Sequence, residues 1–271
     1  GAYWQDDVPI CDHTNIKGHA VRAAYLLSGA TDIAGEIGHD GLLKMIRRVW
    51  RNTTEKNMYI TGGIGPSAHN EGFTVDYDLP NLTAYQETCA TIALAQWNHR
   101  LALLYGDAKY ADIVERALYN GVLAGVSQDG QRFFYVNPLA SRGTHHRSSW
   151  FSCACCPPNV ARTLASLGGY AYGVSEDALY VNLFIQGSAR TTLRGQSATI
   201  EVTTDYPWDG RLTLRPRLSS PTTFGLRLRV PGWCEGVKVR VNRALIDNPK
   251  VEHGYLALDL VFIQINSQLI G

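Results

Sequence analysis

The stretch Asn159–Gln186, NVARTLASLGGYAYGVSEDALYVNLFIQ, contains the change of pattern that decides the fold. Its first part, Asn159–Tyr170, follows Pro157-Pro158 and predicts a helix, because the first turn of a helix has no intrahelical use for the N–H that proline lacks. Its last part, Ala178–Gln186, has the composition of a strand. We place the boundary between a helical and a strand-rich region near Gly173–Asp177.

Before this boundary the hydrophobic periodicity is mostly helical. The other predicted helices are His19–Leu27, Asp40–Trp50, Thr88–Tyr105 and Lys109–Gly125. The first is expected to end before Gly29, and the third is stopped by Gly106. Between the last of these helices and Asn159, the stretch Gln131–Leu139 predicts a short strand or an extended loop, and Ala140–Trp150 is polar and irregular.

After the boundary the period changes to two. Further predicted strands are Ala198–Thr204, Arg211–Arg217, Phe224–Val230, Lys238–Val241 and Tyr255–Leu260. Turn residues such as Asp209-Gly210 and Pro231-Gly232 separate them, and short strands at this spacing predict a β-sandwich. The last segment, Val261–Gly271, is apolar and uncharged and fits this pattern poorly, so it is expected to be an aggregation-prone edge wherever it is exposed.

Composition limits the class of protein. The 271 residues carry 25 Lys and Arg against 24 Asp and Glu, a net charge of +1, which argues against a nucleic-acid-binding protein. No run approaches the roughly 18 apolar residues of a membrane helix, and the first residues do not have the pattern of a signal peptide. We therefore expect no membrane partner and a cytoplasmic location. The chain begins at Gly1 and not at Met, which indicates a processed chain or a fragment.

Cysteines are the strongest chemical signal. The chain has six: Cys11, Cys89, Cys153, Cys155, Cys156 and Cys234. Three of them fall in the stretch SCACCPPN, Ser152–Asn159. A disulfide framework is one interpretation, but the chain is not a small secreted scaffold, and clustered thiols that act as thiolates need a reducing compartment. Thiolate ligation of a metal such as zinc fits better, although this spacing alone leaves the matter open.

Two further ligands are available at the start of the third predicted helix. In a regular helix, Glu87 and Cys89 would point about 200° apart and could not share a metal ion. Both can bind one ion only if Glu87 lies in extended backbone at the entrance to the helix. The alternative is that Cys89 is a small buried residue and that Glu87 simply favours the helix N-terminus.

Several motifs occur together and in a fixed order. They are KGHAVR (Lys17–Arg22), GGIG (Gly62–Gly65), HNEGF (His69–Phe73), DYDLPN (Asp76–Asn81), YQETC (Tyr85–Cys89), FYVNPL (Phe134–Leu139) and CACCPPN (Cys153–Asn159). In this order they resemble glycoside hydrolase family 127, the β-L-arabinofuranosidases with a cysteine nucleophile. The resemblance extends from about Gly18 to Asp259.

The resemblance implies a role for specific residues. It implies a Zn²⁺ site made by Glu87, Cys89, Cys155 and Cys156. It implies that Cys155 is also the nucleophile and that Glu71 is the general acid/base. His19 and Tyr135 would contact the sugar or help to organise the nucleophile, whereas Cys153 has no assigned role in this pattern.

The resemblance also implies an architecture. Members of the family have a catalytic (α/α)6 barrel followed by β-sandwich material, and such a barrel needs many more helices than are predicted here. We therefore expect an N-terminally truncated member. Residues 1–175 would form the C-terminal half of the (α/α)6 barrel, and residues 176–271 would form the β-sandwich, in whole or in part. Activity of a chain with half a barrel is left open.

Three functions compete at this point. The first is a retaining glycoside hydrolase that acts on β-linked L-arabinofuranose of plant-type glycans or glycoconjugates. The second is a non-catalytic fragment with a structural zinc site. The third is a metal-free cysteine hydrolase with His145 or His146 as its base. The stretch GGIG lacks the spacing of a nucleotide-binding loop, so a carbohydrate is the expected partner, and self-association is left open.

Overall fold

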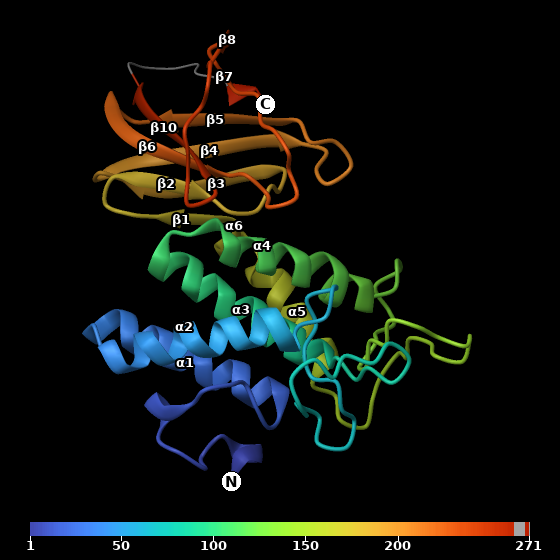
Figure 1. Cartoon of the computed structure of the whole chain (residues 1–271). Coiled ribbons are helices and arrows are strands. Elements are labelled where there is room, and N and C mark those ends of the chain that lie inside the picture. Colours follow the sequence, from blue (N-terminus) through green and yellow to red (C-terminus); the bar gives the residue numbers. More distant parts are fainter. Residues whose placement is uncertain (263–268, 271) are drawn as a thin grey trace. The chain divides into compact units, whose positions relative to one another are not determined.

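The computed structural model describes residues 1–262 and 269–270. Helices come first along the chain and strands follow (Figure 1). The α-helices are α1 (Ala20–Ile37), α2 (Asp40–Asn52), α3 (Thr88–Tyr105), α4 (Ala108–Ala117), α5 (Cys156–Ser166) and α6 (Gly168–Ala171). Single 3-10 turns occur at Ala2–Trp4, Ile10–Asp12 and Leu123–Gly125, and π turns at Thr53–Asn57 and Leu118–Val122. The chain divides into two compact units, one of residues 1–105 and 113–165, the other of residues 106–112 and 166–271.

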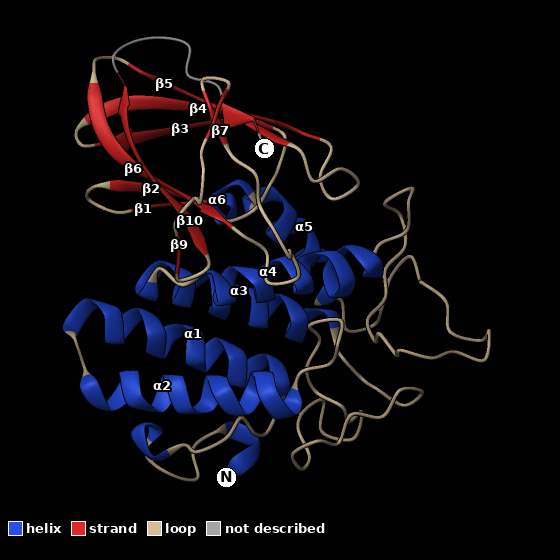
Figure 2. Cartoon of the chain, turned by 45° about the horizontal axis from the view of Figure 1, so that its top comes forward, coloured by secondary structure: helices blue, strands red, loops and turns tan. Residues whose placement is uncertain are grey.

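The first unit is built around α1, α2 and α3. Helix α1 packs against both of the others, and it lies beside α2 in Figure 2. Its buried face is made largely of alanine, and α3 is apolar and buried along most of its length. Small residues let the two backbones approach, and Trp97 of α3 donates a hydrogen bond from Nε1 to Thr31 Oγ1 of α1 (3.1 Å). The described helices include none that is long and apolar enough to span a bilayer.

Helix α1 differs from the prediction. It does not end before Gly29 but continues to Ile37 and ends at Gly38, whose φ of 64° is the left-handed conformation that favours glycine after a helix. A glycine inside a helix costs only about 1 kcal/mol relative to alanine. Burial of Ala30 and Ala34 beyond Gly29 offsets this cost, because these residues lie on the packed face.

Two other helical predictions need correction. Helix α4 ends at Ala117 and not at Gly125, because the following π turn brings Gly121 against α3, where a Cβ would lie 2.4 Å from Thr91 Cγ2. Helix α5 begins at Cys156, so the two prolines lie inside its first turn and not before it. The stretch Gln131–Leu139 is an extended loop with isolated bridges, the second of the two predicted alternatives.

The second unit contains the strands. They are β1 (Tyr172–Val174), β2 (Ala178–Val181), β3 (Gly187–Leu193), β4 (Gln196–Thr204), β5 (Leu212–Leu218), β6 (Thr222–Arg229), β7 (Arg240–Val241), β8 (Ala244–Leu245), β9 (Val251–Glu252), β10 (Tyr255–Phe262) and β11 (Leu269–Ile270). Within the described residues they form a five-stranded sheet in the order β1-β2-β6-β10-β9 and a six-stranded sheet in the order β3-β4-β5-β11-β7-β8. Strands β2 and β6 are parallel, and the neighbouring pairs around them are antiparallel.

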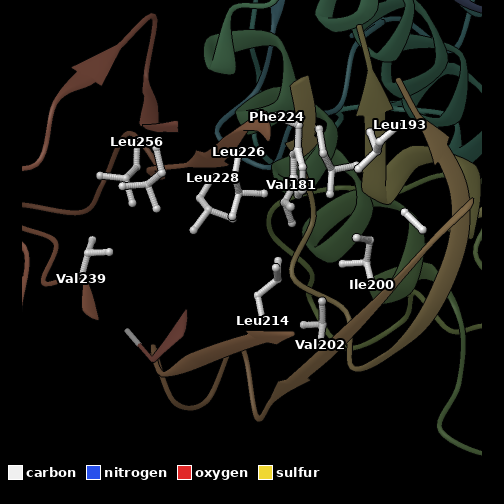
Figure 3. Close-up of a cluster of buried hydrophobic side chains, with 13 residues drawn as sticks. Val181, Leu193, Ile200, Val202, Leu214, Phe224, Leu226, Leu228, Val239 and Leu256 are labelled. Carbon is white, nitrogen blue, oxygen red and sulfur yellow. The ribbon is translucent and has the colours of Figure 1, made fainter. Parts of the chain in front are cut away.

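Both sheets turn one face toward the same apolar core (Figure 3). Leu179 and Leu226 reach this core from the five-stranded sheet, and Ile200, Val202 and Leu214 reach it from the six-stranded sheet. Alternate residues of β4 are buried, as the period of two predicts. This core holds the strand-rich unit together.

Some strand boundaries depart from the predictions. Strand β2 ends at Val181 and not at Gln186, because Asn182 leaves the ladder: its carbonyl accepts from Arg229 Nε (2.6 Å) and its side chain accepts from Tyr255 Oη (2.7 Å). Strand β3 was not predicted. Within the segment 261–271, Leu269–Ile270 pairs with β5 on one side and with β7 on the other, so these two residues do not form an edge, whereas 263–268 and 271 lie outside the described residues.

Candidate active site

A cluster of three thiols and one carboxylate lies where α3 and α5 begin. Cys89 Sγ lies 3.6 Å from Cys156 Sγ, and Cys155 Sγ lies 3.8 Å from Cys156 Sγ and 3.4 Å from Glu87 Oε1. The ligand atoms of all four residues are within 4.8 Å of one another. Residues that are 68 positions apart in the sequence thus form a group that could hold a metal ion.

Glu87 and Cys89 can face the same point because of where α3 begins. The helix starts at Thr88, so Glu87 precedes it, and the Glu87 carbonyl accepts from the N–H groups of Ala90 and Thr91. Gln86 has a φ of 40°, which turns the chain sharply just before the helix. This is the entrance geometry that the spacing of the two ligands requires.

Hydrogen bonds from two neighbouring loops hold this turn. Gln86 Nε2 donates to the Asn137 carbonyl (2.8 Å), and Asn137 Nδ2 donates back to the Gln86 carbonyl (2.9 Å). Thr61 Oγ1 donates to Gln86 Oε1 (2.8 Å), and a Cβ on Gly63 would lie 2.1 Å from that same oxygen. The glycine-rich stretch at 62–65 therefore supports the cluster. Sequence reasoning missed Gln86 and Asn137, although both lie inside the motifs YQETC and FYVNPL.

Burial makes the cluster costly to charge without a counter-ion. Glu87 is 3% exposed, its burial raises the pKa of its carboxyl, and its Oε2 has no hydrogen-bond partner among the described residues. Burial also raises the pKa of Cys155 to about 12. The hydrogen bond between Cys89 and Cys156 lowers the pKa of Cys89 and raises that of Cys156. Four such groups ionise together only if a cation lies among them.

Glu71 lies on a loop before α3, and both of its carboxyl oxygens have partners. Tyr85 Oη donates to Oε1 (2.7 Å), and His19 Nε2 lies 3.3 Å from Oε2. The Glu71 side chain is 39% exposed, so its carboxyl can meet a ligand from solvent. The residue has a φ of 47°, a left-handed backbone that a glutamate rarely adopts.

The Glu71 loop is tied to the start of α1. Ala20 N–H donates to the Glu71 carbonyl (3.0 Å), and Phe73 N–H donates to the Gly18 carbonyl (2.9 Å). Between them, Gly72 lies so close to this segment that a Cβ would be 1.9 Å from the Gly18 carbonyl oxygen. His19 caps α1, its Nδ1 accepting from Arg22 N–H (3.5 Å). This contact therefore sets the position of Glu71 relative to His19.

A Gly72→Ala substitution is expected to lower the free energy of unfolding by about 2–3 kcal/mol, because the two backbone segments must separate to admit the methyl group. Gly29→Ala is the matched control. Nothing lies within 4 Å of a Cβ at Gly29, so that substitution should stabilise α1 by about 0.5–1 kcal/mol. Urea denaturation measures the free energy of unfolding of both variants. If Gly72→Ala is no less stable than Gly29→Ala, the close contact at Gly72 is contradicted.

One cavity of about 470 Å³ connects these groups. Six of the predicted site residues line this cavity: His19, Glu71, Glu87, Cys89, Tyr135 and Cys155. The volume lies within the range of small-molecule sites. Cys156 belongs to the cluster but is fully buried behind the wall. The structure thus brings together all seven residues expected at the site.

The Tyr135 hydroxyl is in contact with the Cys155 thiol. Its hydroxyl lies 3.3 Å from Cys155 Sγ and 4.0 Å from Cys153 Sγ, and Cys153 is exposed in the same cavity. A second part of the wall was not predicted: Arg162 Nη2 donates to Tyr25 Oη (3.1 Å) and to Asn159 Oδ1 (2.6 Å). Nothing in the composition around Tyr25 or Arg162 distinguishes them from surface residues.

His145, one of the two residues expected as the base of a cysteine hydrolase, is engaged elsewhere. His145 Nε2 lies 2.8 Å from the Val136 carbonyl, and its ring stacks on Phe134 with centroids 4.6 Å apart. The contacts of Cys155 go to Tyr135, Glu87 and Cys156. This arrangement gives no support to His145 as a base for Cys155.

Comparisons with known proteins show the family of this chain. Residues 1–169 match the family model described as the catalytic domain of GH127 β-L-arabinofuranosidases, and residues 178–263 match the model of the GH127 middle domain. The chain is 36% identical to a non-reducing end β-L-arabinofuranosidase of Bifidobacterium longum subsp. longum, over 98% of this chain and 42% of that protein.

Solved structures give the same result. A GH127 β-L-arabinofuranosidase from Geobacillus stearothermophilus T6 is similar with a TM-score of 0.94 and 43% identity, over 99% of this chain and 44% of that one. A GH127 β-arabinofuranosidase is similar with a TM-score of 0.93 and 40% identity, over 100% and 45%. The chain thus spans less than half the length of these relatives. Because the catalytic-domain model covers more than half of the chain, the protein belongs to glycoside hydrolase family 127.

Proposed function

We propose that the chain carries the catalytic site of a retaining glycoside hydrolase that releases β-L-arabinofuranose from plant-type glycans or glycoconjugates. The observation that carries the proposal is that Glu71 and Cys155 line one cavity, the carboxyl partly exposed and the thiol next to the four-residue cluster. Family membership and the β-L-arabinofuranosidase activity of the relative from Bifidobacterium longum support the same sugar. In the proposed architecture, residues 1–175 are half of an (α/α)6 barrel and residues 176–271 are a β-sandwich.

Zinc is the metal that we propose for the cluster. Tetrahedral zinc with Zn–S bonds of about 2.3 Å separates its sulfur ligands by about 3.8 Å. The sulfur atoms of Cys89, Cys155 and Cys156 are spaced by 3.6 and 3.8 Å, and the buried Glu87 Oε2 lacks a partner among the described residues. When bound, zinc would hold Cys155 in its thiolate form at a pH where burial otherwise keeps it protonated.

In the first step, the Cys155 thiolate attacks the anomeric carbon of the bound sugar. The C–S bond forms as the glycosidic C–O bond breaks, and the electron pair of that bond goes to the leaving oxygen. Glu71, in its acid form, donates its proton to this oxygen. Tyr135, with its hydroxyl 3.3 Å from Sγ, holds the sulfur in place.

In the second step, water displaces the thiolate. Glu71, now a carboxylate, takes the proton of the water as its oxygen attacks the anomeric carbon, and the C–S bond breaks with its electron pair returning to sulfur. Two inversions at one carbon give net retention of configuration. The partly exposed Glu71 carboxyl suits both roles, because water and leaving group reach it from the same cavity.

A Glu71→Gln substitution tests the proposal. The amide cannot donate the proton, so kcat for an alkyl β-L-arabinofuranoside is expected to fall by about 10²- to 10⁴-fold, and an activated aryl glycoside should be cleaved in the first step with a much smaller loss. Glu36→Gln, an exposed change on α1, is the control and should leave kcat unchanged. Turnover, product configuration by NMR and zinc content by elemental analysis are measured together.

Other outcomes favour the competing functions. Zinc near one per chain with no turnover of any β-L-arabinofuranoside would overturn the hydrolase and favour a structural metal site. Absence of zinc from freshly purified, reduced protein would overturn the metal assignment and favour the metal-free cysteine hydrolase.

A further inference from the structure

A second tyrosine, Tyr85, contacts the proposed acid/base. Tyr85 Oη donates to Glu71 Oε1 (2.7 Å), and the Tyr85 ring lies beside that of Tyr135, with centroids 6.2 Å apart. Tyr135 in turn contacts Cys155 Sγ. Tyr85 is half-buried and is not among the residues that line the described cavity, so it reaches Glu71 from behind.

The backbone of Tyr85 is hydrogen-bonded to the loop that carries Glu71 and to the loop that carries Tyr135. Its N–H donates to the Pro66 carbonyl (3.1 Å), at the start of the loop that carries Glu71. Its carbonyl accepts from Asn137 N–H (3.0 Å), in the loop that carries Tyr135. The Tyr85 hydroxyl is therefore held at a defined place relative to both groups.

The backbone of Glu71 is tied to the start of α1, but its side chain has few contacts. It lies on a loop, and its side chain is 39% exposed. One oxygen of its carboxyl accepts a hydrogen bond from Tyr85, and the other lies 3.3 Å from His19 Nε2. A carboxyl that must transfer a proton has to stay within about 0.5 Å of its working position, and locked neighbours achieve this better than a free loop side chain.

We propose that Tyr85 is a positioning residue for Glu71, which rests on the function proposed above. Its hydroxyl holds the carboxyl toward the cavity. Without that hydrogen bond the side chain can turn toward solvent through its exposed side. The cost falls on the steps in which Glu71 gives or takes a proton, and sugar binding and the attack by Cys155 are spared.

The test is Tyr85→Phe, which removes the hydroxyl and keeps the ring. For an alkyl β-L-arabinofuranoside, kcat is expected to fall by about 10- to 100-fold with KM within about twofold, the scale of a misplaced catalytic group. For a dinitrophenyl glycoside, whose leaving group needs no proton, the first-step rate should stay within about threefold of the wild type. Azide, which attacks without a base, should restore turnover of the activated substrate in the variant.

Tyr59→Phe is the matched control. Tyr59 is 2% exposed and its hydroxyl has no partner among the described residues. Loss of this hydroxyl should therefore leave the turnover of both substrates unchanged. An equal loss on both substrates in Tyr85→Phe, or no loss on the alkyl glycoside, would overturn the positioning role. If Glu71→Gln shows the leaving-group dependence and Tyr85→Phe does not, this inference alone fails. If the wild type cleaves neither substrate, it fails together with the proposed function.

Discussion

Replacing Cys155 by serine is expected to lower kcat by about 10⁴-fold or more, the size of effect seen when an enzyme loses its nucleophile. A serine hydroxyl is not ionised at neutral pH, so it is a much weaker nucleophile than the Cys155 thiolate. The thiol contacts both Tyr135 and Glu87, which places it where cavity and cluster meet. Steady-state turnover and mass spectrometry of a trapped thioglycosyl adduct measure the effect.

Cys11→Ser is the control for this experiment. Cys11 is half-buried, lies outside the cavity and outside the four-residue cluster, and should tolerate the change. If Cys155→Ser keeps turnover within about tenfold of the wild type, the nucleophile is another group and the proposed mechanism fails.

Cys156→Ser is expected to have the second large effect, on metal content and stability. Cys156 lies between Cys89 and Cys155 at 3.6 and 3.8 Å from their sulfur atoms and is 0% exposed. Loss of this ligand should reduce zinc from about one per chain to a small fraction. A metal present at about 1,000 times its Kd stabilises the folded state by about 4 kcal/mol, so Tm should fall by about 10 °C.

Chelation of the wild type is the companion measurement for Cys156→Ser. A chelator should lower the wild-type Tm to that of Cys156→Ser, and added zinc should restore the wild type alone. The Cys11→Ser variant should respond like the wild type. Equal zinc content and equal Tm in wild type and Cys156→Ser would contradict a metal role for the cluster.

Local signals were sufficient for part of the fold. Helix α3 has the predicted bounds, Thr88–Tyr105, because a strong apolar pattern ends at Gly106, whose φ of 59° suits glycine. The prediction failed for α1, where a glycine inside the pattern was taken as its end. Whether Gly29 ends the helix depends on packing of the residues after it, and that packing involves residues of α3 far away in sequence.

The candidate site divides in the same way. The residue types that could form it stand in the motifs YQETC, HNEGF and CACCPPN, because thiols and carboxylates in such a pattern already indicate metal or nucleophile chemistry. Their spacing also required Glu87 to precede a helix, and α3 begins at Thr88. The hydrogen bond from Tyr85 to Glu71 and the close approach of Gly72 to Gly18 have no counterpart in the spacing.

The sequence by itself therefore determined the family, the helical and strand periods, and the thiols and carboxylates that could bind a metal or act as a nucleophile. These features follow from residue type and short-range spacing. Only the tertiary structure decided which of those residues meet. Residues 68 positions apart come within hydrogen-bonding distance because α3 and α5 begin at one place. The physical reason is that helix ends and loop contacts depend on packing between distant segments, which no local pattern of side chains encodes.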